Sequence, residues 1–376
     1  CVTAAAARRG TMRGAGAALA VAAAAAVALA SASYHRNDHP VEPGLLLFDG
    51  RAFEFAMVSD LDLKSRDPEQ FLWRSLLKRG TLRAVRQEDS CGAADKLYRL
   101  EWGRTLTLES ETAKRNRSME LSELVRFEDR LLAMCDYTGL IFKIDTYDPP
   151  PGKNPKVFQR WAIADGNGAK TKPCKLEWAT VKDGVLWVGS IGKEWNDADG
   201  SVVHRDAEWV KTIDAQGRVQ NHNWHHVYDA LKFAANASKG GYLWHEAVHF
   251  CPRNRKWYIL PRKRTFTTPY DPVTDEHMGT NILLTASEDF RDIDVQTIGP
   301  LQDDRGFTAL RKIPGTDDHF LALKVREVGD ETATWVAAFD ASGNMLLDKS
   351  QPGVDEDGFY YITDPEHVKF EGLEFV

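Results

Sequence analysis

The sequence has little cysteine, and it has no excess of positive charge. Five cysteines in 376 residues are too few for a fold that depends on a dense disulfide framework. The four that follow the N-terminal segment allow two disulfides in three alternative pairings, or buried free thiols: Cys91, Cys135, Cys174 and Cys251. The formal net charge of −7 argues against nucleic acid as a partner, because nucleic-acid-binding domains are usually basic.

Several common catalytic signatures do not explain this chain. It has no Walker A motif, so a P-loop does not hold phosphates. It also has no G-x-S-x-G motif that would mark a serine nucleophile. His245 and His249 flank Glu246, but this stretch is predicted to form a strand rather than the helix of a zinc protease. Any chemistry therefore has to come from other residues.

Long hydrophobic runs are confined to the N-terminus. A basic stretch there precedes an alanine-rich apolar run that ends near Ala30. This order predicts a secretory signal over residues 1–32, either cleaved or retained as a signal anchor, and residues 33–52 form a polar lead-in. Sequons at Asn116 and Asn236 agree with passage through the secretory pathway.

The rest of the chain is rich in aromatic residues and in short apolar stretches separated by turn residues. Its 11 Trp, 10 Tyr and 17 Phe suit the half-buried surfaces of β-sheets. Strand–turn–strand patterns recur at residues 122–145, 177–192, 246–263 and 308–324. An Asp-Gly hairpin turn is predicted at Asp183 and Gly184, and one short helix at residues 224–236. The fold class is therefore predicted to be all-β.

A polar residue opens each recurring strand unit, and successive openings are separated by 54 to 69 residues. These residues are Glu123, Glu177, Glu246, Thr308 and Glu371. A period near sixty fits blades of four strands, so residues 53–376 are predicted to form a five-bladed β-propeller. The final segment FEGLEFV would close the ring beside the N-terminal strands. Two β-sandwiches are the alternative.

Equivalent positions on the innermost strands of a propeller converge on its central channel. Several glutamates there would repel one another and take up protons unless a cation bound between them. The oxygen ligands that the pattern offers belong to Ser122, Glu123, Glu177, Glu246, Thr308 and Glu371. Six to eight hard oxygen ligands suit Ca²⁺, and no His/Cys pattern favours zinc.

Other charged and aromatic residues are candidates for contact with a substrate. Asp60 and Asp62 follow a predicted strand, and they either orient a water molecule or cap a turn. Arg262 and Lys263 lie in a basic run that either binds phosphate oxygens or is simply solvated. Trp178 offers a stacking surface for a base unless it belongs to the core. The remaining candidate substrate contacts are Lys64, Arg66, Glu120 and Lys193.

The chain resembles the soluble calcium-activated nucleotidases, or apyrases, in nine collinear segments. Among them are SDLDLKSR (Ser59–Arg66), SMELSELVRF (Ser118–Phe127), KLEWATVKDGVLWVGSIGKEW (Lys175–Trp195), GYLWHEAV (Gly241–Val248) and FEGLEF (Phe370–Phe375). Together the segments span nearly all of residues 53–376. The chain departs from the family pattern at Thr308, where relatives carry Ser, at Glu123, where some carry Asp, and at Lys64, where an acid is usual.

The resemblance implies one central Ca²⁺ that is required for activity, bound by the six oxygen-ligand residues named above. It also implies hydrolysis of nucleoside di- and triphosphates, such as UDP, GDP, ADP and ATP, to monophosphate and inorganic phosphate. On this basis we expect Asp60 or Asp62 to position the attacking water. Arg262, with Lys263 or Lys193, is expected to offset charge that develops on the phosphate oxygens.

Two other functions are compatible with the same fold. One is a secreted binding module in which Ca²⁺ only stabilises the propeller, as any ligand of the folded state does. The other is a calcium-dependent lactonase on a similar scaffold. The expected partners are nucleotides, a membrane where the N-terminal segment is retained, and a second copy of the chain in a homodimer. The expected location is the secretory pathway, either the lumen of the ER or Golgi or the exterior of the cell.

Overall fold

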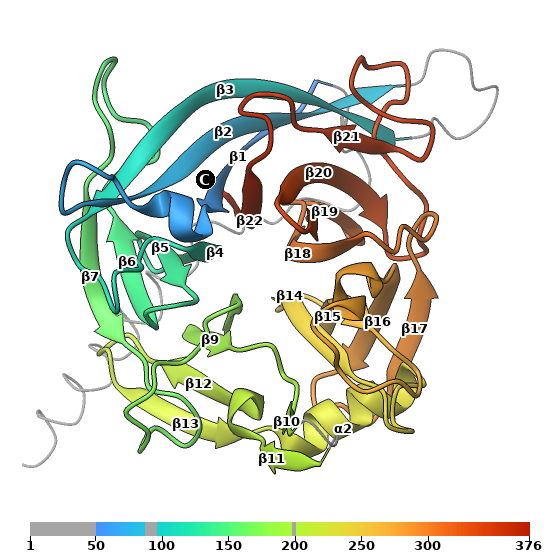
Figure 1. Ribbon diagram of the computed structural model, residues 1–376. Helices are drawn as coiled ribbons and strands as arrows, with labels where there is room; N and C mark the ends of the chain where they lie inside the picture. The colour runs from blue at the N-terminus through green and yellow to red at the C-terminus, as the bar shows by residue number, and fades with distance from the viewer. Residues whose placement is uncertain (1–49, 87–95, 198–200) are drawn as a thin grey trace, which may run out of the picture. The chain divides into compact units, whose positions relative to one another are not determined.

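A computed structural model describes residues 50–86, 96–197 and 201–376. These residues form five four-stranded antiparallel sheets arranged as the blades of a propeller (Figure 1). The prediction of an all-β, five-bladed propeller is therefore confirmed, and the alternative of two β-sandwiches is wrong. The predicted N-terminal signal and Cys91 lie outside the described residues. No helix within the described ranges has the length and apolar character needed to cross a membrane.

Each blade has four strands that run from the hub to the outer edge, in the order given below. Blade 1 contains β22 (Lys369–Phe375), β1 (Ala52–Asp60), β2 (Trp73–Arg86) and β3 (Lys96–Ser110). Blade 2 contains β4 (Leu121–Phe127), β5 (Arg130–Cys135), β6 (Leu140–Ile144) and β7 (Val157–Ala162). Blade 3 contains β8 (Trp178–Lys182), β9 (Val185–Gly189), β12 (Trp209–Ile213) and β13 (Val219–Asn223). Blade 4 contains β14 (Leu243–Cys251), β15 (Lys256–Arg264), β16 (Ile282–Ser287) and β17 (Ile293–Thr297). Blade 5 contains β18 (Arg305–Lys312), β19 (His319–Val328), β20 (Glu331–Asp340) and β21 (Phe359–Tyr361).

Short elements connect the blades. The predicted helix at residues 224–236 is present as α2 (His225–Ala234), which buries Val227, Tyr228 and Leu231. A small hairpin of β10 (Trp195–Asn196) and β11 (Val202–His204) extends from blade 3. Three 3₁₀ turns complete the list: η1 (Asp62–Ser65), η2 (Asp206–Glu208) and η3 (Thr274–His277).

The ring closes where the C-terminal strand joins the N-terminal strands. β22 pairs antiparallel with β1, so the last strand of the chain becomes the innermost strand of blade 1. The inner strands β22, β4, β8, β14 and β18 contact one another in that order, and β18 contacts β22. The prediction that FEGLEFV closes the ring is confirmed.

The apolar core is divided among the junctions between neighbouring blades. Five clusters of buried side chains each combine residues from two adjacent blades. In one of them, Phe55 and Leu373 of blade 1 pack with Leu321 and Val336 of blade 5. This burial holds the blades together. The three cysteines in the described part of the chain, Cys135, Cys174 and Cys251, are buried free thiols, so no disulfide joins the blades there.

The predicted Asp183–Gly184 hairpin is present between β8 and β9. Lys182 pairs with Val185 across a two-residue loop in which both residues have positive φ, 52° for Asp183 and 72° for Gly184. Two positive φ angles are the requirement of a type I′ turn, and the Asp-Gly pair tolerates them. The turn fixes the register of β8, which leads back to the hub.

Candidate active site at the propeller hub

Irregularities in strand pairing recur at the hub. The ladders skip Ser122 on β4, Glu246 on β14, Thr308 on β18 and Glu371 on β22. Such bulges leave one residue unpaired and redirect its side chain. Glu177 directly precedes β8, and its backbone N–H donates to the carbonyl of Gly189 at 2.9 Å. The repeat residue is therefore the bulged residue in blades 1, 4 and 5, whereas in blade 2 the bulge falls on Ser122, one residue before Glu123, and in blade 3 Glu177 precedes the strand.

Three of the hub glutamates are buried and share cationic partners. Nη1 of Arg262 donates to both carboxylate oxygens of Glu246 at 3.0 and 2.8 Å, and to Oε1 of Glu371 at 3.2 Å. Nζ of Lys175 pairs with Glu177 and, at 2.6 Å, with Oδ2 of Asp136. Burial raises the pKa of Glu177 to about 8 and raises the pKa of Glu371 well above its usual range.

Two hydroxyl groups at the hub make no hydrogen bond. Oγ of Ser122 and Oγ1 of Thr308 are buried, and neither has a partner among the described residues. Buried polar atoms normally have a partner, so these two oxygens are suited to a ligand. With the three buried carboxylates they supply oxygen atoms of the kind that Ca²⁺ prefers. Among the described residues, the one group of acidic side chains whose ligand atoms lie within 4.8 Å of one another is Asp60, Asp62 and Glu120, so the three hub glutamates do not all lie that close together.

Glu123 does not join this group. Its carboxylate accepts hydrogen bonds from the backbone N–H of Leu124 at 2.8 Å and of Ala179 at 3.3 Å. It also pairs with Nη2 of Arg311 at 3.1 Å, and Arg311 binds Glu374 rather than another hub glutamate. Glu123 therefore does not share the cations Arg262 and Lys175 that hold the other three glutamates, and its assignment as a metal ligand stays a prediction.

A second acidic group follows β1 beside the hub. Carboxylate oxygens of Asp60, Asp62 and Glu120 lie within 4.8 Å of one another. Oδ1 of Asp60 accepts the backbone N–H of Asp62 at 2.8 Å, so the turn-capping role considered for Asp60 is present. Arg117 forms a bidentate ion pair with Glu120, in which Nε donates to Oε1 at 2.8 Å and Nη2 donates to Oε2. Burial raises the pKa of Glu120 to about 7.

One lysine joins the acidic group to the hub. Nζ of Lys369 lies 3.1 Å from Asp60, 2.6 Å from Asp62 and 3.1 Å from Glu327. Glu327 also accepts Nη2 of Arg262 at 2.8 Å. Carboxylates and cations therefore alternate from Asp62 to Glu246, and each cation bridges at least two acids.

The sequence reasoning missed five members of this network, which are Lys175, Asp136, Arg117, Lys369 and Glu327. A signal for two of them was present, because Lys175-Leu176-Glu177 and Lys369-Phe370-Glu371 share the pattern K-x-E at hub positions. Residues i and i+2 of a strand project to the same face, so a lysine two positions before a hub glutamate reaches the same side.

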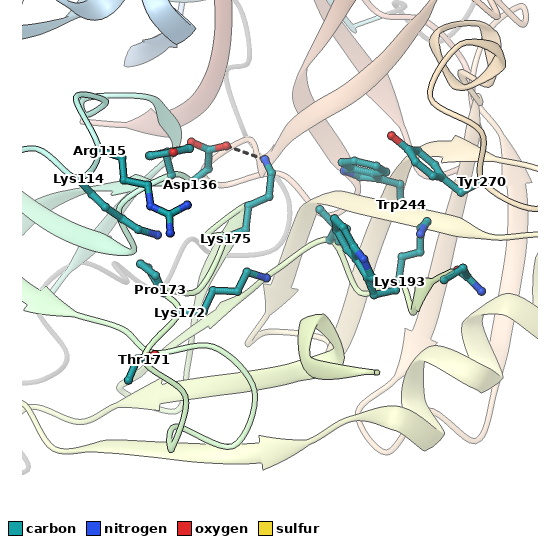
Figure 2. A pocket seen from close by; sticks show the side chains of 14 residues that line it. Lys114, Arg115, Asp136, Thr171, Lys172, Pro173, Lys175, Lys193, Trp244 and Tyr270 are labelled. Atoms are coloured by element: carbon teal, nitrogen blue, oxygen red, sulfur yellow. Dashed lines mark hydrogen bonds and ion pairs between the residues drawn. The ribbon is translucent and has the colours of Figure 1, made fainter. Parts of the chain in front are cut away.

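A cavity of about 690 Å³ lies beside the hub (Figure 2). Lys114, Arg115 and Lys172 lie on one side of it, and Trp244 and Tyr270 lie on the opposite side. Lys175 and its partner Asp136 line the same cavity. The other lining residues are Tyr137, Thr171, Pro173, Ile191, Lys193, Trp195 and Asn196.

The predicted substrate contacts differ in how well they fit this cavity. Lys193 lines it and is 4% exposed, and burial lowers its pKa. Trp178 is fully buried, and its indole N–H donates to the carbonyl of Ser190 at 3.1 Å. The hypothesis that Trp178 stacks on a base is therefore wrong, because the ring belongs to the core between blades 3 and 4.

The other four predicted contacts lie apart from the cavity lining, and one of them, Glu120, belongs to the acidic group beside the hub. Lys64 and Arg66 are exposed at the η1 turn. Lys263 pairs with Asp275 beside Arg262. Trp195, Trp244 and Tyr270 instead provide the aromatic surface of the cavity.

Comparison with known proteins places the chain among nucleotide-hydrolysing relatives. A family model described as Apyrase matches residues 61–376. The soluble calcium-activated nucleotidase 1 of Rattus norvegicus is 36% identical over 347 residues, which cover 92% of this chain and 79% of the relative. The apyrase of Cimex lectularius is 33% identical over 343 residues, which cover 90% and 85%. Apyrase apy-1 of Caenorhabditis elegans is 34% identical over 337 residues, which cover 87% and 86%.

Proposed function

The chain belongs to the apyrase family of nucleotide phosphatases, and we propose that it hydrolyses nucleoside di- and triphosphates to monophosphate and inorganic phosphate with the help of Ca²⁺. The observation that carries this proposal is the alternating network of buried carboxylates and cations at the hub. A polyphosphate needs cations for its oxygens, and a water molecule that attacks phosphorus needs an acceptor nearby. The hub provides both beside a cavity of suitable size for a nucleotide.

For the metal we propose a ligand set of Glu177, Glu246 and Glu371 with the hydroxyls of Ser122 and Thr308. The unpartnered hydroxyls and the raised pKa values of Glu177 and Glu371 support this set, because a divalent cation satisfies both. Glu123 is left out because its partners are Arg311 and two backbone amides, and not the cations Arg262 and Lys175 that hold the other three carboxylates. When bound, Ca²⁺ supplies positive charge to the phosphate oxygens.

The protein residues around the metal position account for the remaining requirements. The side chain of Asp62 is 42% exposed, so we assign it to orient the attacking water while Asp60 holds the turn. Lys369 keeps both acids in place. Arg262 and Lys175 are assigned to the phosphate oxygens. The water oxygen forms a bond to the terminal phosphorus, the bridging P–O bond breaks, and the shortened nucleotide leaves.

The nucleoside is assigned to the cavity. Trp244 and Tyr270 lie opposite the cations and offer a surface for contact with a base, in place of the buried Trp178. Trp195 lies nearer Lys172, whose Nζ is 5.7 Å from its ring centre. Lys193 lies beneath Tyr270, with Nζ 4.6 Å from the ring centre, and is close enough to contact a phosphate in the same cavity. Phosphates near Lys175 and a base near Trp244 would place the substrate along the cavity in Figure 2.

The deciding experiment measures phosphate release from UDP, GDP, ADP and ATP, with Ca²⁺ and with a chelator. We expect release that depends on Ca²⁺ for at least one of the four nucleotides. Equal release under both conditions would contradict the role of the metal, and no release from any nucleotide would leave the binding module as the better account. A lactone substrate in the same series tests the alternative of a calcium-dependent lactonase.

We also propose the secretory pathway as the location, on the basis of the predicted signal at residues 1–32 and the two sequons. Asn116 and Asn236 are both exposed, so the folded surface leaves room for a glycan at each. Endoglycosidase treatment of the protein from secretory cells would shift its mobility on a gel where either sequon is occupied.

A further inference from the structure

Three cations on one side of the cavity lie beyond the hub and have little negative charge near them. Lys114 and Arg115 precede β4, and Lys172 precedes β8, so two blades supply them. Neither Lys114 nor Arg115 has a carboxylate within ion-pair distance among the described residues, whereas Lys172 pairs with Asp165 at 2.8 Å. Figure 2 shows them facing the same space as Lys175.

The three cations are also close enough to repel one another. Burial and the neighbouring charges of Arg115 and Lys172 lower the pKa of Lys114. On the opposite side, Lys193 is 4% exposed, and among the described residues it has no carboxylate partner; its Nζ donates to the carbonyl of Glu194 at 2.8 Å. Both sides of the cavity therefore carry cations without a carboxylate partner in the described part of the chain, Lys114 and Arg115 on one side and Lys193 on the other. This arrangement is expected where an anion binds.

We infer that Lys114, Arg115 and Lys172 form a subsite for the phosphate groups that do not react, and that this subsite favours nucleoside triphosphates over diphosphates. This inference rests on the proposed function. The reacting phosphate belongs at the hub, where Lys175 and Arg262 lie, so the rest of the chain of phosphates extends into the cavity. A triphosphate places one more charged group there than a diphosphate does.

The subsite contacts a part of the substrate that does not change during the reaction. Such contacts stabilise the ground state and the transition state equally, so they affect KM and leave kcat unchanged. The subsite also lies opposite Trp244 and Tyr270, which leaves the base and the phosphates that do not react with separate surfaces.

The test compares UDP with UTP, and ADP with ATP, as substrates of two variants. The first is Lys114→Ser with Arg115→Ser, which leaves the Lys172–Asp165 ion pair intact and so protects folding. The second adds Lys172→Ser. A control that loses as many positive charges as the triple variant substitutes three exposed lysines that do not line the cavity by Ser: Lys153, Lys156 and Lys239.

We expect the double variant to raise KM for the triphosphates about tenfold, and KM for the diphosphates less than about twofold, at unchanged kcat. The control should leave KM unchanged for both the triphosphates and the diphosphates. An equal rise for both substrate classes, or no rise, would overturn the inference while leaving the proposed function in place. Binding of tripolyphosphate and pyrophosphate, measured by calorimetry, decides the subsite independently of turnover. Tripolyphosphate should bind the unsubstituted protein more tightly, and the double variant should lose that difference.

Discussion

Arg262 contacts carboxylates from three different strands with a single guanidinium group. It reaches Glu246 on β14, Glu371 on β22 and Glu327 on β19, and it is 7% exposed. We expect Arg262→Ala to lower kcat/KM at least a hundredfold, because a charge-assisted contact to the reacting phosphate is removed. Phosphate release measures this effect. Arg264→Ala, two positions further along β15, is the matched control, and survival of turnover in Arg262→Ala would assign the arginine a structural role.

Glu123 and Glu246 both lie on inner strands at the hub but have different partners. Arg311 and two backbone amides hold Glu123, whereas Glu246 lies at a bulge and shares Arg262 with Glu371. We expect added Ca²⁺ to raise the Tm of Glu123→Gln as it does that of the unsubstituted protein. Glu246→Gln should lose most of that rise, because it removes a proposed ligand. The reverse pattern in a thermal melt would restore Glu123 to the ligand set.

Lys324 is a buried cation whose main neighbours are aromatic rings. Its Nζ lies 5.0 Å from the ring centre of Phe307 and 5.3 Å from that of Phe359, with Oε1 of Gln302 at 3.5 Å. Burial lowers its pKa from 10.5 to about 7. Between these two pH values the unfolded chain binds a proton that the folded protein releases, so stability should increase as the pH rises.

We expect Lys324→Met to be more stable than the unsubstituted protein at pH 7 by a few kcal/mol. The lowered pKa of Lys324 costs about 1.4 kcal/mol of folding free energy for each pH unit between its folded and unfolded values. Its stability should also depend less on pH between 7 and 10.5, because the titrating group is absent. Urea unfolding at several pH values measures both effects. Lys256→Met, an exposed lysine on β15, is the control and should behave as the unsubstituted protein does. If the free energies of unfolding of both variants changed with pH in the same way, Lys324 would not be the group that titrates in this range.

Among the elements, β22 and β4 approach each other more closely than a side chain allows. A Cβ atom on Gly372 would lie 2.6 Å from the backbone carbonyl carbon of Glu123 and 2.7 Å from the backbone nitrogen of Leu124. Because neither backbone moves easily, Gly372→Ala should force the inner strands apart and destabilise the protein by about 1–3 kcal/mol. It should also weaken the Ca²⁺-dependent rise in Tm, since Glu371 is adjacent.

The control for this substitution is Gly103→Ala on β3, where the nearest atom to an added Cβ is a side-chain carbon of Arg79 at 3.1 Å. That contact is longer than those at Gly372 and lies between outer strands, so a shift of a few tenths of an ångström relieves it. Equal loss of stability in the two variants, measured by urea unfolding, would show that the closeness of the inner strands has no special importance.

The elements were more predictable from the sequence than the contacts at the hub. Asp183–Gly184 and the spacing of Glu123 to Glu371 are local or periodic signals, and they were sufficient for the turn and the five blades. The partners of the acids were not predictable, because they depend on ring closure: Lys369 and Asp60 are 309 residues apart in the sequence. Trp178 was misread for a similar reason, since its neighbours come from blade 4 and α2.

At the scale of the whole molecule, ring closure depends on one short strand. β22 provides the innermost strand of blade 1, the hub residue Glu371 and the bridging Lys369. It also contributes Phe370 and Leu373 to the core between blades 5 and 1. Deletion of residues 369–376 should therefore remove the single cooperative unfolding transition, because two junctions between blades lose their shared strand. Differential scanning calorimetry measures the transition.

A chain that begins at Leu47 is the control, because it retains every strand of the five blades. We expect it to unfold at the same temperature as the full chain, with the same Ca²⁺-dependent rise. A synthetic peptide of residues 368–376, added to the deleted protein, should restore part of the transition by pairing with the free edge of β1. If the deleted protein unfolds in one sharp transition at an unchanged Tm, closure by β22 does not hold the propeller together, and the hub must be assembled by the remaining four inner strands.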